Sequence, residues 1–195
     1  RPGYNNLRNF MQYDSRYLYE GGNPYLRPEY THNVELSAVH KWLSASVDYD
    51  YVHKPMLHAF GLYDNQEIAY FSVRNMGHYQ MLSASVTASP TFSWYHPSWE
   101  IDYSQLFFRE PTSLCSNHPS FSFILRNSLV FPHGWLASLD LYGYTDSYEP
   151  MRRSVGFVTV YARLRKSFFK NRLVFLLQAS DLTKSNRERW TYYGT

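Results

Sequence analysis

Apolar and polar side chains alternate along most of the chain. In one stretch Leu43, Ala45 and Val47 occupy one side, while Ser44 and Ser46 occupy the other. The same period of two recurs near 34–42, 82–88, 121–131, 135–141, 158–164 and 173–179. Because successive side chains of a strand point to opposite faces, the pattern predicts strands with one apolar and one polar face. Helical spacing fits these windows less well.

The pattern predicts an all-β chain of about eight strands. We place them near 31–41, 43–60, 67–88, 94–108, 118–131, 135–146, 153–168 and 172–183. Several reach the roughly 9 to 11 residues that a tilted strand needs to cross a bilayer. Their length favours an antiparallel up-and-down meander that forms part of a transmembrane β-barrel.

The connections between these strands alternate in length. Tight links are expected at Lys41-Trp42, Ser89-Pro90, Pro132–Gly134 and Phe169–Asn171, and longer polar ones near 61–66, 109–117 and 146–152. Short turns on one side and long loops on the other are typical of outer-membrane barrels.

Aromatic residues make up 19% of the chain, and they support two different interpretations. Trp42, Tyr51, Trp94, Trp99, Trp135 and Phe168 fall near predicted strand ends, where a barrel has its aromatic girdles. A soluble antiparallel barrel or sandwich is the alternative. Such a module would bind carbohydrate or lipid through exposed rings, for which Trp94, Tyr95 and Trp99 are the candidates.

The charge and the cysteine content exclude few classes of function. The formal net charge is +3, and the 19 Lys and Arg are scattered, so we expect no nucleic acid partner. The single Cys115 gives neither a disulfide framework nor a metal cluster. No apolar run approaches the roughly 20 residues of a membrane helix.

Two prolines precede the first predicted strand. Pro24 and Pro28 fix their own backbone and push the preceding residues toward extended conformations. Gly21 and Gly22 supply a turn before them. The segment is therefore a stiff lead-in that reaches the strand already extended.

This segment resembles a motif in the C-terminal half of TonB-dependent outer-membrane receptors. The matching residues are Gly22, Asn23, Pro24, Leu26, Pro28, Glu29, Asn33, Glu35 and Leu36. Weaker similarities are Asn75-x-Gly77, which precedes a descending strand in the family, and Asp181-Leu182, which ends the penultimate strand. The tyrosine-rich composition is most similar to barrel families of Bacteroidetes.

The resemblance implies that 1–195 is a fragment of one β-barrel domain. Residues 1–30 would be an extracellular loop, 31–183 strands and loops, and 184–195 a truncated loop. The parent would be a receptor in the bacterial outer membrane that takes up a glycan, peptide, metal chelate or vitamin. Its implied partners are outer-membrane lipid, a plug domain, the remaining barrel strands, a TonB-type energy-coupling protein and a surface lipoprotein. The plug, the coupling box and the aromatic-ended final strand of the family are missing here.

The sequence contains few residues or motifs that indicate catalysis or metal binding. The eight histidines show no metal-binding spacing, and neither a nucleophile motif nor a phosphate-binding Gly-rich loop occurs. We expect no catalytic residue, metal or cofactor, and therefore no enzyme. Asp48, Asp50 and Asp140 are interpreted as solvated lumen positions. Ligand contacts are expected from the loops at 1–30, 109–117 and 146–152.

Overall fold

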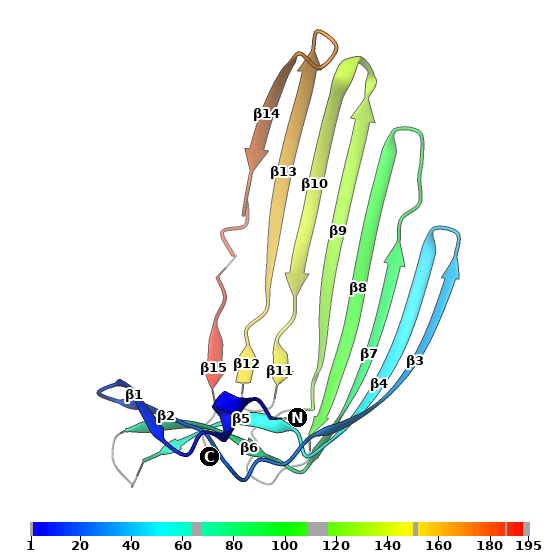
Figure 1. Cartoon of the computed structure of the whole chain (residues 1–195). Helices are drawn as coiled ribbons and strands as arrows, with labels where there is room; N and C mark the ends of the chain where they lie inside the picture. Colours follow the sequence, from blue (N-terminus) through cyan, green and yellow to red (C-terminus); the bar gives the residue numbers. More distant parts are fainter. Residues whose placement is uncertain (1, 64–67, 109–116, 150–151, 186, 193–195) are drawn as a thin grey trace.

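The computed structural model describes residues 2–63, 68–108, 117–149, 152–185 and 187–192. Its main feature is an antiparallel sheet of eight long strands, drawn upright in Figure 1. Across the sheet these are β14 (Leu173–Ala179), β13 (Phe157–Phe168), β10 (Trp135–Tyr144), β9 (Pro119–Phe131), β8 (Tyr95–Phe108), β7 (His78–Ala88), β4 (Leu43–His53) and β3 (Tyr30–His40). Each long strand pairs with those next to it in the chain, so the predicted up-and-down meander is confirmed.

The pairing register collects the apolar positions on one face. One row across the sheet runs through Leu43, Ala88, Trp99, Leu125, Leu141 and Val160. A row on the other face runs through Ser46, Ser85, Asp102 and Ser122. Apolar-face side chains remain exposed, with Leu36 at 74% and Ile101 at 51%. An apolar face of this extent needs an apolar surrounding, which lipid supplies.

The large sheet is open among the described residues. β3 and β14 are its two edges, and they do not pair with each other. Every residue of β3 is exposed, as is every residue of β14 except Ala179. Two such long edges present unpaired backbone groups, so the sheet needs neighbouring strands on both sides.

Two smaller sheets lie at the lower end of the large one (Figure 1). One contains β1 (Met11–Ser15), β2 (Leu18–Gly21), β6 (Ala69–Asn75) and β5 (Met56–Leu62), in which β2 and β6 pair in parallel. The other contains β11 (Ser147–Glu149), β12 (Arg152–Ser154) and β15 (Trp190–Tyr192). We call this end, where the longer connections lie, the loop end.

In the part of the chain that the structure describes, helical structure is limited to α1 (Tyr4–Leu7) and the short turn η1 (Pro132–Gly134). Neither these nor any other helix in the described residues is long and apolar enough to span a membrane. Residues 1–30, expected as loop, contain α1, β1 and β2.

The predicted strands 43–60 and 67–88 were wrong, because each is two strands in different sheets. β4 ends at His53, and β5 begins at Met56 after Lys54 and the fully buried Pro55. The second break, at Met76-Gly77, is bonded to the first, since Met76 N–H donates to Pro55 O at 3.0 Å and Lys54 N–H to Gly77 O at 2.9 Å. The chain bends there, so β5 and β6 leave the large sheet.

The strand predicted at 153–168 is also divided, into β12 and β13. Gly156 lies at this break, where a Cβ atom would collide with the backbone of Tyr144 and Thr145. The buried apolar side chains lie at the loop end rather than along the sheet: Leu26, Val52, Ala59, Val73 and Phe108. The loop end is therefore the packed part of this chain.

Candidate functional site

The polar face of the large sheet carries a network of hydroxyls. Ser104 and Ser120, opposite each other on β8 and β9, share a hydrogen bond of 2.8 Å between their Oγ atoms. Ser122 Oγ donates to Asp102 Oδ2 at 2.9 Å. Such a wall suits a water-filled interior, as in wide barrels.

A cleft crosses this polar face at the loop end. It consists of two adjoining hollows of about 430 and 390 Å³, which share Ser104, Ser120, Ser147 and Glu149. Each is within the size range of ligand pockets. β7, β8, β9 and β10 supply one wall, and residues of β11, β12 and β15 supply the other.

The hairpin of β11 and β12 is held in place by Asp146. Its Oδ1 accepts from Gly156 N–H at 2.8 Å, and its Oδ2 accepts from Arg153 Nη2 at 2.5 Å. The bond from the Gly156 backbone, and after it the bond from Arg153, hold the pKa of Asp146 below its ordinary value of 3.8. These contacts fix the cleft wall before any ligand arrives.

Of the described residues that line the first hollow, more are carboxylates than cations. The carboxylates are Asp102, Glu149 and Glu188, and the cation is Arg152, which is ion-paired with Glu149. Together with the serine hydroxyls, they offer mainly hydrogen-bond acceptors. Trp190 lies there as well. The cleft therefore suits a ligand rich in hydrogen-bond donors, with a flat face that can lie against an aromatic ring.

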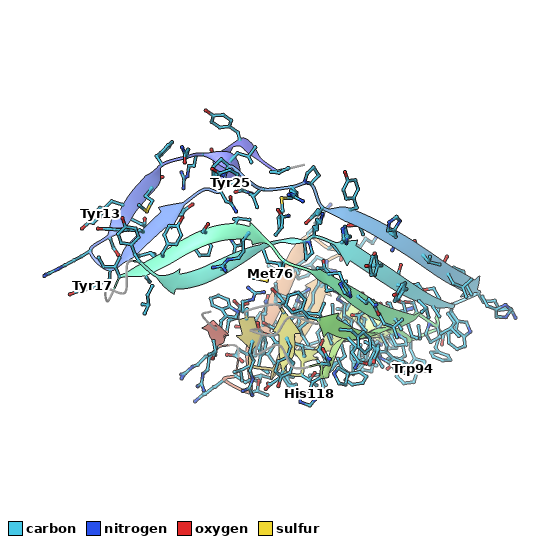
Figure 2. The ribbon with its side chains drawn as sticks, turned by 90° about the horizontal axis from the view of Figure 1, so that it is seen from below. Tyr13, Tyr17, Tyr25, Met76, Trp94 and His118 are labelled. Carbon is cyan, nitrogen blue, oxygen red and sulfur yellow. The ribbon has the colours of Figure 1, made fainter. Side chains whose placement is uncertain are left out.

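More of the residues that line the second hollow are aliphatic or aromatic than in the first. Tyr79, Met81 and Leu106 of the sheet face Tyr148 of the hairpin, whose ring lies 5.7 Å from that of His118. Figure 2 views the molecule from the loop end and labels His118 there. An elongated ligand would thus meet acceptors at one end and rings and aliphatic groups at the other.

The aromatic residues singled out in the sequence lie elsewhere. Trp94 is the last residue of the β7–β8 connection and Tyr95 is the first of β8, at the short-turn end of the sheet. Tyr95 OH and Trp99 Nε1 both donate to Asn127 Oδ1, at 2.7 and 3.1 Å. The structure does not bring these rings to the cleft. Residues 147–149 and 152 of the predicted loop 146–152 do line it, whereas 109–116 lie outside the described residues.

Residues of the proline-containing motif brace the loop end. Asn23 Nδ2 donates to Val73 O at 3.2 Å, and Glu29 Oε2 accepts from Met56 N–H at 3.1 Å. Leu26 is buried.

The other motif residues have various surroundings. Gly22 lies so close to Arg8 that a Cβ would not fit. Pro24 and Pro28 are exposed. Asn33 Nδ2 donates to Asp50 Oδ1 at 2.9 Å. Glu35 lies opposite Asp48 on the polar face, and Leu36 opposite Val47 on the apolar face.

Among the described residues, no three His, Cys, Asp or Glu side chains converge closely enough to hold a metal ion. The arrangement supports binding through hydrogen bonds and ring contacts.

The family is decided by a match over the whole length of the chain. The model of the outer membrane protein beta-barrel family matches residues 1–195. The chain belongs to this family. Its location is therefore the bacterial outer membrane, and the apolar face of the sheet is the face that meets lipid. No curated protein and no solved structure matches the chain. Membership of an outer-membrane family does not fit the alternative of a soluble binding module.

Proposed function

We propose that this chain forms part of the wall and outer loops of a TonB-dependent receptor that takes up a nutrient. The observation that carries the proposal is the cleft on the polar face, at the end where outer-membrane barrels have their extracellular loops. A ligand captured there lies inside the barrel, at the start of a path through it. The motif from Gly22 to Leu36 supports the receptor type by resemblance.

The open sheet supports a barrel larger than the described strands. Eight strands that curve without closing need further strands between β14 and β3. The largest outer-membrane transporter barrels have a plugged lumen, so we include a plug domain among the partners. The remaining proposed partners are outer-membrane lipid, a TonB-type energy-coupling protein and a surface lipoprotein.

The side chains that line the cleft favour some of the possible ligand classes over others. Its excess of acceptors favours a neutral or cationic ligand with many donor groups, such as a glycan or a peptide, over an anionic chelate. We propose no catalytic role, because the sequence has no nucleophile and base motif and ligand capture explains the cleft.

The test uses the full-length protein in its own bacterium. The gene is deleted, and uptake is measured with labelled oligosaccharides, oligopeptides, a ferric chelate and cobalamin. We expect uptake of one class to be lost, and the same loss when the energy-coupling gene is deleted. The double variant Glu188→Gln/Trp190→Ala should lower the affinity for that ligand by about tenfold or more.

The matched control is Trp94→Ala, which removes an exposed indole at the opposite end of the sheet. It should leave ligand affinity unchanged. Uptake that persists without the coupling protein and does not saturate would identify a passive pore and refute the receptor. Uptake that depends on the coupling protein but is unchanged in the cleft variant would support the receptor and refute this binding site.

A further inference from the structure

A second pocket, of about 490 Å³, lies at the loop end outside the cleft. It is lined by Arg27 from the segment before β3, Lys54 from the turn after β4 and Arg74 from β6, with His53 and His78 beside them. Among the described residues that line it there is no carboxylate. Its electrostatics are therefore opposite to those of the cleft.

The three cations are not neutralised within the described part of the chain. The ion pairs found there involve Arg8, Arg152 and Arg153, and none includes Arg27, Lys54 or Arg74. Arg27 and Arg74 are exposed, and Lys54 is partly exposed. The motif carboxylate in this region, Glu29, accepts a hydrogen bond from Met56 N–H.

Asn75 holds the backbone of two of these cations together. Its Nδ2 donates to Arg27 O and to Lys54 O, both at 2.9 Å, and its Oδ1 accepts from Arg27 N–H at 2.7 Å. One side chain thus fixes segments that are 48 and 21 residues away in the sequence. These hydrogen bonds therefore hold the backbone at Arg27 and Lys54 in a fixed position in the pocket.

The backbone of Lys54 is in the left-handed region, with φ at 53°. Other turns of the described chain, that at Lys41 among them, have the same conformation, so it describes the shape of the turn and does not mark a site. Asparagine adopts this conformation more readily than lysine, so the turn can be kept when the charge is removed.

The pocket borders the membrane-facing side of the sheet. His53 and His78 lie opposite each other on β4 and β7, in line with the apolar face. The Tyr51 ring on that face lies 5.6 Å from the His78 ring and 6.4 Å from the His32 ring. A cluster of amphipathic rings at the end of an apolar face marks the headgroup level. In Figure 2, Met76 of the pocket lies where β5 and β6 meet the large sheet.

The pocket is positively charged, its backbone is held by Asn75, and it lies beside the apolar face of the sheet. We therefore propose that the pocket binds a phosphate group on a lipid of the outer leaflet. Arg27 and Arg74 supply forked donors that match phosphate oxygens, and Lys54 supplies a compact positive charge. Basic pockets at the membrane surface recognise anionic headgroups in this way. The bound lipid would anchor the outer loops to the membrane.

The test uses the full-length protein, purified in a mild non-ionic detergent. Three probes are titrated: bisphosphorylated lipid A, the same lipid with its phosphates removed, and inorganic phosphate. Bound lipid is counted by native mass spectrometry. We expect saturable binding of the phosphorylated lipid and at least tenfold weaker binding of the other two probes.

The variant Arg27→Gln/Lys54→Asn/Arg74→Gln should weaken binding of the phosphorylated lipid by tenfold or more. Asparagine tolerates the left-handed conformation, so the turn at 54 should still form. Lys41→Asn is the matched control, because Lys41 has φ at 54° in the turn between β3 and β4, at the opposite end of the same strand pair. That variant should bind like the wild type.

Three results would overturn the proposal. Equal binding of the dephosphorylated lipid would show that acyl chains alone are responsible. Binding of inorganic phosphate as tight as that of the lipid would identify a site for a soluble anion. Equal loss in the Lys41 control and the triple variant would show a general effect of charge.

Discussion

Asn75 and Arg27 bond each other in both directions: Arg27 N–H donates to Asn75 Oδ1, and Asn75 Nδ2 donates to Arg27 O. This pair joins the segment before β3 to the end of β6. It also connects two of the three sequence features that resemble receptor motifs, the segment from Gly22 to Leu36 and Asn75-x-Gly77.

Replacing Asn75 by Ala should destabilise the loop end. Three hydrogen bonds are lost, at a net cost of about 1–3 kcal/mol. The temperature at which the loops of the full-length protein become sensitive to protease should fall. Asn9→Ala, at an exposed position of the N-terminal segment, is the control and should leave that temperature unchanged.

The two faces of β4 should respond differently to a charge. Val47 is on the apolar face and Ser46, its neighbour, is on the polar face. Val47→Arg should lower the free energy of unfolding by about 2–4 kcal/mol when the side chain faces the bilayer centre, and Ser46→Arg by about 1 kcal/mol or less. Denaturant unfolding of the full-length protein in lipid vesicles measures both. Equal costs would show that the lipid-facing side is wrongly assigned.

Thr159 and Asp181 form a partly buried contact beside the end of β14. Thr159 is fully buried, and its Oγ1 donates to Asp181 Oδ1 at 3.0 Å. The same Oδ1 accepts from Ser185 N–H at 3.0 Å. Thr159→Val keeps the shape but removes the donor, so it should cost about 1–3 kcal/mol of unfolding free energy.

Thr87→Val provides the comparison for this change, because Thr87 is on the same polar face but only half-buried. Its effect on the denaturation midpoint should be small. A midpoint shift as large as that of Thr159→Val would mean that the bond to Asp181 is not the cause.

The hairpin of β11 and β12 should loosen in acid. Because the pKa of Asp146 in the folded protein is below 3.8, its contacts add stability above that pH, and this stability is lost as the pH falls through the lowered pKa. The hydrogen-exchange protection factor of the Gly156 amide, which donates to Asp146, should fall over that range. Asp146→Asn should give lower protection at neutral pH and remove the pH dependence. A protection factor that falls equally in both proteins would point to other carboxyl groups.

The alternation of side chains determined the fold class and the two faces. Each residue of a strand points away from its neighbour by local geometry, so Val47 and Ser46 could be assigned to opposite faces without knowing their partners. The family and the outer-membrane location agree with that prediction. The short turns at Pro132–Gly134 and Lys41-Trp42 were placed correctly, because they interrupt the alternation locally. The tight link expected at Ser89-Pro90 was wrong, since that connection runs from Ser89 to Trp94.

Contacts between distant segments of the chain fix the bends, the cleft and the basic pocket. No turn was predicted at Lys54 or Met76, and the bends at both places became visible only in the hydrogen bonds between the two turns. The cleft joins residues of β8 and β9 to Trp190, and the basic pocket joins Arg27, Lys54 and Arg74, which no local pattern connects. Local geometry sets the direction of each side chain, whereas a site depends on which strands become neighbours, and long-range packing alone fixes that.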